Sequence, residues 1–260
     1  GGSRSSTAEA YLKPARKRKN LTVVTRAQAA RVLFEGDRAV GVEYSVGSRK
    51  PQKASAKREV LLCGGALNSP QLLMLSGIGP AAELQAHGIE VRVDAPEVGA
   101  NLQDHLDICT MQRCTQKITY DHASDIAVGL QYYLFKKGPG TSNIAEAGGF
   151  LRSKFAEDSR PDVQFHFFPY STDRVDPSLH KFSGFTMSVC KLRPESRGTV
   201  EIKSADPNAA PAIQPNFLER ESDVATMLDG VKLIRKLAAT PALSRWAKCE
   251  RDPGPDCASD

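Results

Sequence analysis

Residues 60–80, VLLCGGALNSPQLLMLSGIGP, are the stretch that decides the fold. The apolar run over residues 59–63 is typical of a buried strand. Ser69 has the properties of a helix N-cap, and Pro70 suits a first helical position, which predicts a helix from Pro70 to Leu75. A strand, a turn and a helix in this order are typical of α/β proteins.

The turn of this stretch contains Gly64 and Gly65. Without a Cβ atom, both residues let the backbone approach a ligand closely, and the helix start offers unpaired N–H groups to an anion. This geometry suits a dinucleotide, although a tight turn without a ligand explains two glycines as well. No GxGxxG or Walker motif occurs in the chain, so these residues would supply only part of a nucleotide site.

Toward the amino terminus, short β-branched or apolar runs predict a three-stranded meander over residues 21–25, 30–34 and 40–44. Toward the carboxyl terminus, the pattern predicts helices over residues 81–87, 124–136 and 223–239, and strands over residues 90–93, 108–114, 147–151, 163–168, 185–192 and 199–202. We therefore expect an α/β domain over residues 1–104, and an antiparallel sheet flanked by helices over residues 105–260.

The composition is that of an ordinary globular chain, with 25% charged and 40% hydrophobic residues among 260. It excludes disordered and fibrous classes. No apolar run approaches the ~20 residues of a membrane helix, and none resembles a signal peptide. The chain begins Gly-Gly and ends in a Pro-rich stretch, which indicates a portion of a longer protein.

The charges and the cysteines point to no further site. Residues 13–19 (KPARKRK) form the only dense basic run, and a solvated turn explains them better than a nucleic-acid partner, because no aromatic residue interleaves them. The six cysteines include no CxxC pair, so we expect no metal site, and free thiols in a reducing compartment such as the cytoplasm.

The stretch over residues 65–79 resembles, position for position, the second signature of the glucose-methanol-choline (GMC) oxidoreductases. Further segments resemble the family in the right order: residues 2–12, 20–25, 38–44, 98–105 and 196–200. The run TSNIAEAGGF at residues 141–150 is most similar to the branch of choline dehydrogenases and flavin-dependent alcohol dehydrogenases.

The resemblance implies an FAD enzyme that oxidises an alcohol to an aldehyde by passing hydride to flavin N5. It also implies that residues 1–104 are part of a Rossmann-like FAD domain without its GxGxxG unit, and that residues 105–260 are a substrate domain without the family's catalytic HPxGT-like His segment. We therefore expect no catalytic residue in this chain. The parent enzyme is expected in the cytoplasm or peripheral to the inner membrane.

Carried over residue by residue, the cofactor contacts come from three segments. The backbone near Ala29 would meet the adenine, residues 63–66 would line the adenosine and pyrophosphate, and the loop before the sheet would lie near the flavin. An Asx-type turn is the alternative for that loop. The expected cofactor-binding residues are Ala29, Cys63, Gly64, Gly65, Asn101, Asp104 and His105.

Glu146, His166 and His180 are the expected substrate-binding residues. By resemblance to choline-oxidising members, Glu146 would pair with a trimethylammonium group; a salt bridge inside the sheet is the alternative. Aromatic residues crowd the strand around His166, where alternation sends Phe165 and Phe167 to one face and His166 and Phe168 to the other. Such rings either recognise a cation or belong to the core.

Two function classes stay open at this point. One is the FAD-dependent alcohol or choline dehydrogenase, and the other is a non-catalytic fragment or binding module that keeps the fold without flavin. The electron acceptor, the choice between dehydrogenase and oxidase, and the oligomeric state are open as well.

Overall fold

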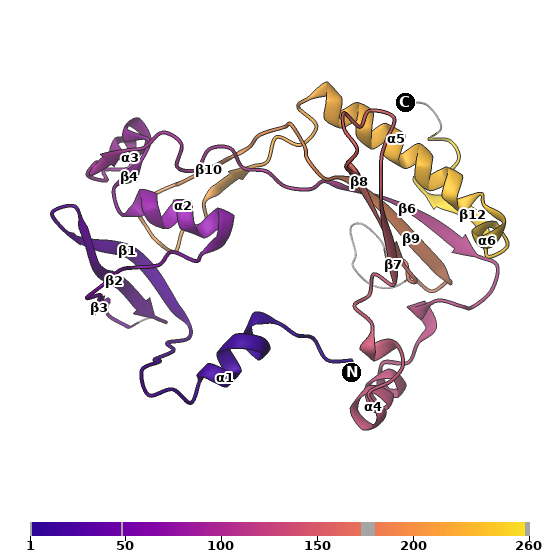
Figure 1. Cartoon of the computed structure of the whole chain (residues 1–260), viewed down its shortest axis with the longest axis horizontal. Coiled ribbons are helices and arrows are strands. Elements are labelled where there is room, and N and C mark those ends of the chain that lie inside the picture. Colours follow the sequence, from indigo (N-terminus) through magenta and orange to yellow (C-terminus); the bar gives the residue numbers. More distant parts are fainter. Residues whose placement is uncertain (1, 48, 173–179, 258–260) are drawn as a thin grey trace. The chain divides into compact units, whose positions relative to one another are not determined.

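The computed structural model describes residues 2–47, 49–172 and 180–257 (Figure 1). Contacts divide the chain into two compact units. The meander unit comprises Ala15–Asp104 and Ser196–Phe217, and the sheet unit comprises Gly1–Pro14, His105–Glu195 and Leu218–Asp260. These units are discontinuous, unlike the expected ranges 1–104 and 105–260, because the segment Ser196–Phe217 pairs with the end of the first range. The roles of the two expected domains stay predictions.

The meander unit contains an antiparallel sheet of three strands, β1 (Ala27–Glu35), β2 (Arg38–Val46) and β3 (Gln52–Ser55). The three-stranded meander is thus confirmed, but its strands differ from those expected. Residues 21–25 form no strand, and the polar β3 takes the third place by pairing with β2. β-branched residues alone do not make a strand, because a strand also needs a neighbouring strand to pair with. The residues that follow β2 pair with it and so form the third strand.

The prediction of a buried strand over residues 59–63 was wrong. This segment is irregular, and the Leu61 side chain is 73% exposed. A strand that is apolar on both faces needs neighbouring strands and covering helices, and none pairs with this segment in the described part of the chain.

Helix α2 (Gly65–Leu75) begins five residues before the expected Pro70 and ends, as its sequence predicts, before Gly77. Pro70 lies within the helix, where it forfeits one backbone hydrogen bond. The helix packs against β1, and the Ser76 hydroxyl ties the two together by accepting a hydrogen bond from the Val32 N–H at 2.8 Å.

The rest of the meander unit consists of short elements: β4 (Ile78–Gly79), α3 (Ala81–Ala86), β5 (Val93–Asp94), β10 (Thr199–Glu201) and β11 (Ala212–Gln214). The helix α3 is confirmed, whereas only Val93 of the strand expected over residues 90–93 is paired. Met74, Leu84 and Ile202 form the buried core of this unit. The strand expected over residues 199–202 pairs with β11 and not with the large sheet.

The sheet unit is built on five antiparallel strands in the order β12-β6-β9-β8-β7. Their bounds are β6 (Asp107–Cys114), β7 (Ala147–Leu151), β8 (Val163–Phe168), β9 (Gly184–Lys191) and β12 (Ala247–Asp252). Helix α5 (Glu221–Ala238) runs along one face of the sheet (Figure 1). The core between them includes Phe165, Phe185, Val189, Met227 and Ile234. The expected antiparallel sheet and final helix are confirmed; β12 is an unexpected strand.

Helix α4 (Asp125–Phe135) is confirmed as well, with Ser124 as its N-cap. The other helical segments of the described chain are short: η1 (Ala8–Leu12), α1 (Lys13–Ala15), η2 (Tyr120–His122), η3 (Pro139–Thr141) and α6 (Pro241–Ser244). Across the described ranges, every helix is too short or too polar to cross a membrane.

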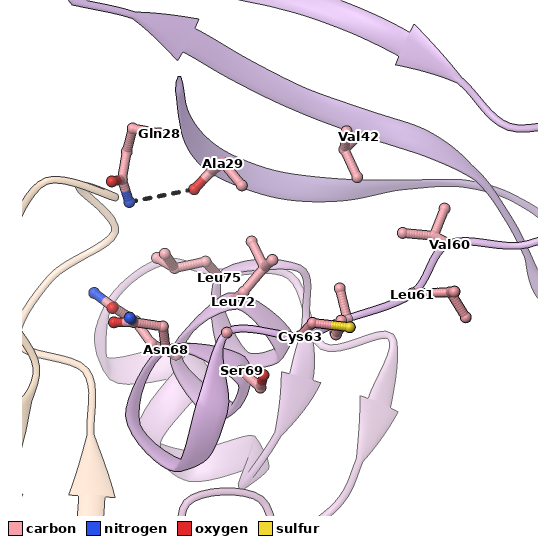
Figure 2. A pocket seen from close by; sticks show the side chains of 13 residues that line it. Gln28, Ala29, Val42, Val60, Leu61, Cys63, Asn68, Ser69, Leu72 and Leu75 are labelled. Carbon is pink, nitrogen blue, oxygen red and sulfur yellow. Dashed lines mark hydrogen bonds between the residues drawn. The ribbon is translucent and has the colours of Figure 1, made fainter. Parts of the chain in front are cut away.

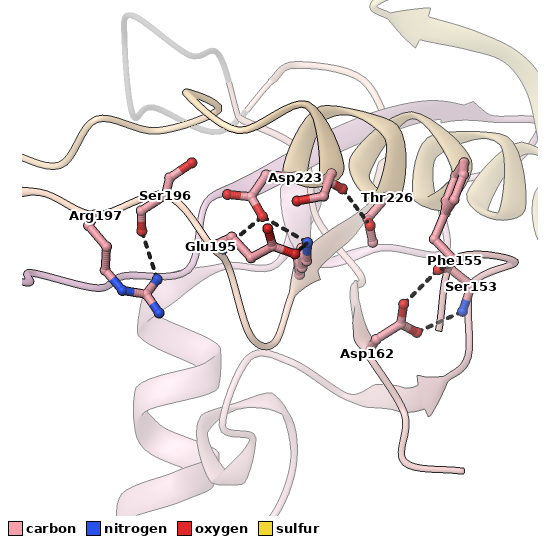
Figure 3. A network of polar contacts seen from close by, with 10 residues as sticks. Ser153, Phe155, Asp162, Glu195, Ser196, Arg197, Asp223 and Thr226 are labelled. Carbon is pink, nitrogen blue, oxygen red and sulfur yellow. Dashed lines mark hydrogen bonds and ion pairs between the residues drawn. The ribbon is translucent and has the colours of Figure 1, made fainter. Parts of the chain in front are cut away.

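Buried polar groups fix the start of α5 to the sheet (Figure 3). The Lys191 ammonium lies 2.8 Å from the Asp223 carboxylate, whose Oδ1 also accepts the Glu195 N–H at 2.9 Å. Nearby, the Asp162 carboxylate accepts both the N–H and the hydroxyl of Ser153, at 2.7 and 2.6 Å. Each carboxylate is buried and is satisfied by these donors.

Candidate functional site

An open pocket of about 340 Å³ lies in the meander unit between the strands β1 and β2 and the start of α2. Figure 2 shows the strands on one side of this strand–helix pocket and α2 on the other. Ala29, Cys63 and Gly64, three of the expected cofactor residues, all line it. The structure therefore brings Ala29 next to Cys63 and Gly64, which follow it by 34 and 35 positions in the sequence, a juxtaposition that only the resemblance implied.

The lining of the strand–helix pocket is partly apolar and partly polar. Val42, Val60, Leu72 and Leu75 are among the apolar residues, and Gln28, Asn68, Ser69 and Gln71 are the polar ones. The amides of Gln28 and Gln71 donate to the Pro207 and Ala209 carbonyl oxygens, at 3.1 and 2.8 Å. The Asn68 and Ser69 side chains make no hydrogen bond to another described residue, so both can serve a ligand.

The start of α2 borders this pocket and carries no side-chain cap. Its first N–H groups therefore lack partners from a capping side chain and can bind an anion. Gly65 opens the helix with φ +75°, a left-handed conformation that an L side chain rarely adopts. Gly65 does not line the pocket itself. A glycine is needed at this position because of its left-handed backbone conformation.

A second pocket of about 480 Å³, the loop pocket, lies on another side of α2 and shares Ser69 with the first. Asn101 lines the loop pocket with a φ of +61°. Asp104 does not line it, and His105 belongs to the sheet unit, where its Nε2 lies 2.9 Å from the Leu192 carbonyl oxygen. The structure thus places Asn101 at a pocket and leaves the roles of Asp104 and His105 as predictions.

Glu146 lies just before β7 and is exposed. The Tyr120 hydroxyl donates to its Oε1 at 2.6 Å, and hydrogen bonds from Ser142 and then Tyr120 lower the pKa of the Glu146 carboxyl below its ordinary value. No cation lies within ion-pair distance in the described part of the chain. Among the described residues, hydroxyl groups meet this carboxylate. The substrate contact and the salt bridge inside the sheet both stay predictions.

His166 and His180 occupy different polar clusters of the sheet unit. The Nδ1 atom of His166 lies 3.3 Å from the Ser188 hydroxyl and 4.0 Å from an Asp107 oxygen. His180 stacks on Phe182 at 4.6 Å between ring centroids, and its Nδ1 lies 3.2 Å from the Ser171 hydroxyl.

The aromatic residues of β8 divide as the alternation predicts. Phe165 is buried in the core under α5, and Phe167 packs against that core. Phe168 contacts His166 and Tyr170, with ring centroids 6.0 and 5.8 Å apart. Phe165 and Phe167 therefore belong to the core. The rings of His166, Phe168 and Tyr170 are those available to a substrate.

The sequence analysis missed the groups that hold Glu146 and His180. Asp121 accepts the Ser171 N–H at 2.8 Å, and the neighbouring Tyr120 reaches Glu146. These contacts join residues 26 and 50 positions apart in sequence. No spacing pattern indicates them; the only signal was a short polar stretch between a strand and a helix.

Within the described ranges, no group of three or more His, Cys, Asp or Glu side chains could hold a metal ion. All six cysteines carry thiols and form no disulfide. Burial and the Asp107 charge raise the pKa of the Cys190 thiol to about 11, so this thiol stays protonated at neutral pH.

The chain belongs to the GMC oxidoreductase family, whose N-terminal part matches residues 1–107 and whose C-terminal part matches residues 194–260. The family expected from the signature at residues 65–79 is thereby confirmed. The chain is 43% identical over its whole length to an alcohol dehydrogenase (acceptor) from Pseudomonas putida, and 41% identical to an oxygen-dependent choline dehydrogenase from Ectopseudomonas mendocina. It covers 48% and 46% of these proteins, so it spans about half the length of the curated relatives it matches.

Solved structures agree with this assignment. A pyridoxine 4-oxidase from Mesorbium loti superposes on 97% of the chain with a TM-score of 0.81 and 28% identity, and the match covers 46% of that protein. A formate oxidase variant of Aspergillus oryzae, studied for FAD modification, superposes on 96% with a TM-score of 0.84 and 26% identity, covering 49%. The mixed α/β fold class with antiparallel sheets is confirmed.

Proposed function

We propose that this chain is the part of an FAD-dependent dehydrogenase that holds the adenosine side of the cofactor and the floor of the substrate site. The reaction would be oxidation of a primary alcohol, with choline as one candidate, to the aldehyde. The names of the relatives from Pseudomonas putida and Ectopseudomonas mendocina support an alcohol or choline as the substrate. The FAD modification of the Aspergillus oryzae formate oxidase supports FAD as the cofactor.

The strand–helix pocket is the observation that carries this proposal. Its apolar residues suit the face of an adenine ring, and Asn68 and Ser69 can hydrogen-bond a ribose. The uncapped start of α2 beside Gly64 suits a phosphate. The residues present therefore fit part of FAD, and the volume of about 340 Å³ is near the lower end of the range of about 300–1,000 Å³ for ligand pockets.

FAD, when bound, supplies the hydride acceptor at its N5 atom. The residues of this chain bind and orient the two reactants. Cys63, Gly64 and Gly65 would hold the cofactor together with the backbone near Ala29, and Asn101 would contact it from the loop pocket. Asp104 and His105 complete the proposed cofactor set.

On the substrate side, Glu146 is an exposed carboxylate, and hydrogen bonds from hydroxyl groups lower its pKa further below neutral pH. Such a group favours a substrate with a positive charge, which agrees with choline. His166 and His180 are proposed to contact the alcohol as well. A cytoplasmic site or peripheral attachment to the inner membrane, and the identity of the electron acceptor, stay predictions.

Flavin content and turnover of the full-length protein test this function. Purified full-length protein should show a flavin absorption band and reduce a dye when choline or 1-butanol is added. Cys63→Trp, which fills the strand–helix pocket, should lose the flavin, whereas Cys249→Trp on the exposed edge strand β12 should retain it. Full-length protein that folds without any flavin would contradict the proposal and favour a non-catalytic protein.

A further inference from the structure

The Glu146 carboxylate is held by a tyrosine hydroxyl from another loop of the sheet unit. The Tyr120 hydroxyl donates to Oε1 at 2.6 Å, and the Ser142 hydroxyl also lowers the pKa of the carboxyl. The bond to Glu146 also raises the pKa of the Tyr120 hydroxyl, which therefore stays protonated and remains a donor at neutral pH. The Glu146 N–H donates to the Phe167 carbonyl oxygen at 3.1 Å, so the backbone at this residue is fixed as well.

The turn that carries Tyr120 is itself braced. The Tyr120 N–H donates to the Pro169 carbonyl oxygen at 2.8 Å. Next to it, the Asp121 carboxylate accepts the Ser171 N–H at 2.8 Å and the Gly184 N–H at 3.0 Å. The turn is thereby tied to the residues that follow β8 and to the start of β9. The Tyr120 hydroxyl consequently reaches Glu146 from a fixed backbone.

The loop before β7 is also ordered by its own contacts. The Ser142 hydroxyl oxygen accepts the Ile144 N–H at 2.8 Å. Ile144 has a φ of +79°, a strained conformation for a β-branched residue. Strain of this kind persists only where the surrounding contacts enforce it, and here it lies two residues before Glu146.

An exposed carboxylate gains little stability from such contacts, because water would solvate it as well. The bracing is therefore not explained by folding. We propose that Tyr120 is a positioning residue that fixes the Glu146 carboxylate in one orientation toward the positively charged group of an alcohol substrate. This inference rests on the proposed function for the identity of the ligand, and on the hydrogen bonds alone for the positioning.

The positioning is tested in this chain without cofactor or substrate. Glutamate labelled with ¹³C at the carboxyl carbon allows the pKa of Glu146 to be measured by NMR in the wild type and in Tyr120→Phe and Ser142→Ala. Each variant removes a hydroxyl that lowers the pKa of the Glu146 carboxyl and should therefore raise that pKa. Tyr133→Phe, which removes an exposed hydroxyl from α4, is the matched control and should leave it unchanged. Circular dichroism shows that each variant is folded. An unchanged Glu146 pKa in the folded Tyr120→Phe variant overturns the inference.

Kinetics of the full-length enzyme test whether the Glu146 carboxylate faces the positive charge of the substrate. Choline is compared with 3,3-dimethylbutan-1-ol, which has the same shape without the charge. Tyr120→Phe should raise the KM for choline about 3- to 10-fold and leave kcat and the KM for the neutral alcohol unchanged. The reason is that the weakened contact contributes equally to binding of the substrate and of the transition state. Equal changes for both alcohols overturn the inference. If the wild type oxidises neither alcohol, the proposed function fails, and the NMR titration alone then supports or overturns the positioning of Glu146.

Discussion

Single residues differ sharply in their environment even when their chemistry is the same, as the cysteines show. Cys63 lies in the wall of the strand–helix pocket and is exposed, whereas Cys190 is buried with a pKa raised to about 11. Alkylation by iodoacetamide requires an accessible thiolate. The cysteines therefore report both on burial and on the occupancy of the pocket.

We expect iodoacetamide at pH 8 to modify Cys63 and Cys249 and to leave Cys190 unmodified. Added ADP, which corresponds to the adenine half of FAD, should slow modification of Cys63 several-fold by covering its thiol. Cys249 is exposed and outside the pocket, so its rate should not change. Mass spectrometry of tryptic peptides gives each rate. Equal rates at Cys63 with and without saturating ADP would be inconsistent with a nucleotide in this pocket.

Asp223 illustrates a charge whose role is stability. Its side chain is 4% exposed and pairs with Lys191, which is 12% exposed (Figure 3). Asp223→Asn should lower the free energy of unfolding by about 1–3 kcal/mol, because the buried Lys191 ammonium would lose its partner at 2.8 Å and be left with the more distant Glu195 carboxylate at 3.9 Å. Glu221→Gln makes the same change of charge at an exposed position in the same helical turn, and should cost less than about 0.5 kcal/mol. Urea denaturation measures both, and a loss for Asp223→Asn as small as for the control would refute this role.

At the scale of elements, packing decides the effect of a substitution more than helix propensity does. Gly230 lies in α5 against β9, and a Cβ atom there would meet the Val189 Cγ2 atom at 2.8 Å. Gly129 lies in α4, where an added Cβ atom would meet no atom within 4 Å. The same change, glycine to alanine in a helix, therefore has opposite expected outcomes.

Gly129→Ala should stabilise the protein by about 0.5–1 kcal/mol, which is the cost of glycine relative to alanine within a helix. Gly230→Ala should destabilise it by about 1–2 kcal/mol, because overpacking of about 1–3 kcal/mol exceeds that gain. Thermal denaturation followed by circular dichroism compares the two. A rise in Tm for Gly230→Ala would show that α5 can move away from the sheet at little cost.

The elements that the sequence predicts well are those whose partners are specified locally. Helix α5 and strands β8 and β9 show clear periodicity, and each lies within a residue or two of its expected bounds. Residues 59–63 have an equally apolar pattern but no partner strand in the described chain, and they form none. Strand β12 is polar and pairs only at the sheet edge with β6, so no apolar alternation indicates it.

The same reasoning explains the candidate sites. Glycines before a helix indicate a ligand-binding turn from local chemistry alone, and Gly64 indeed lines a pocket. The partnership of Tyr120 with Glu146 depends on how two loops are placed by the sheet, which the sequence does not express. Residues that position others across long separations are therefore the hardest to predict.

At the scale of the whole molecule, the two units are interleaved in sequence. Residues 196–217 leave the sheet unit and complete the meander unit: the Ile202 side chain joins the core of Met74 and Leu84, and the Leu102 and Gly198 backbones pair at N···O distances of 2.9 and 2.8 Å. A cut after Asp104 would separate this unit from part of its own core.

We therefore expect a fragment of residues 15–104 to melt without a cooperative transition. The same fragment joined to residues 196–217 through a short Gly-Ser linker should melt cooperatively, because Ile202 is buried to 4% exposure in that core. Far-ultraviolet circular dichroism during heating distinguishes the two. A cooperative transition at the same Tm in both fragments would show that residues 196–217 add nothing to the unit.

The central claim is that the strand–helix pocket of the meander unit binds the adenosine side of FAD. A titration of the ¹⁵N-labelled chain with ADP, followed by amide chemical shifts, tests it most directly. We predict saturable shifts at Ala29, Cys63 and Gly64 and at the first amides of α2, with β12 as the unaffected reference. Saturating ADP that leaves those amides unshifted, or that shifts only residues outside the pocket, would contradict the claim.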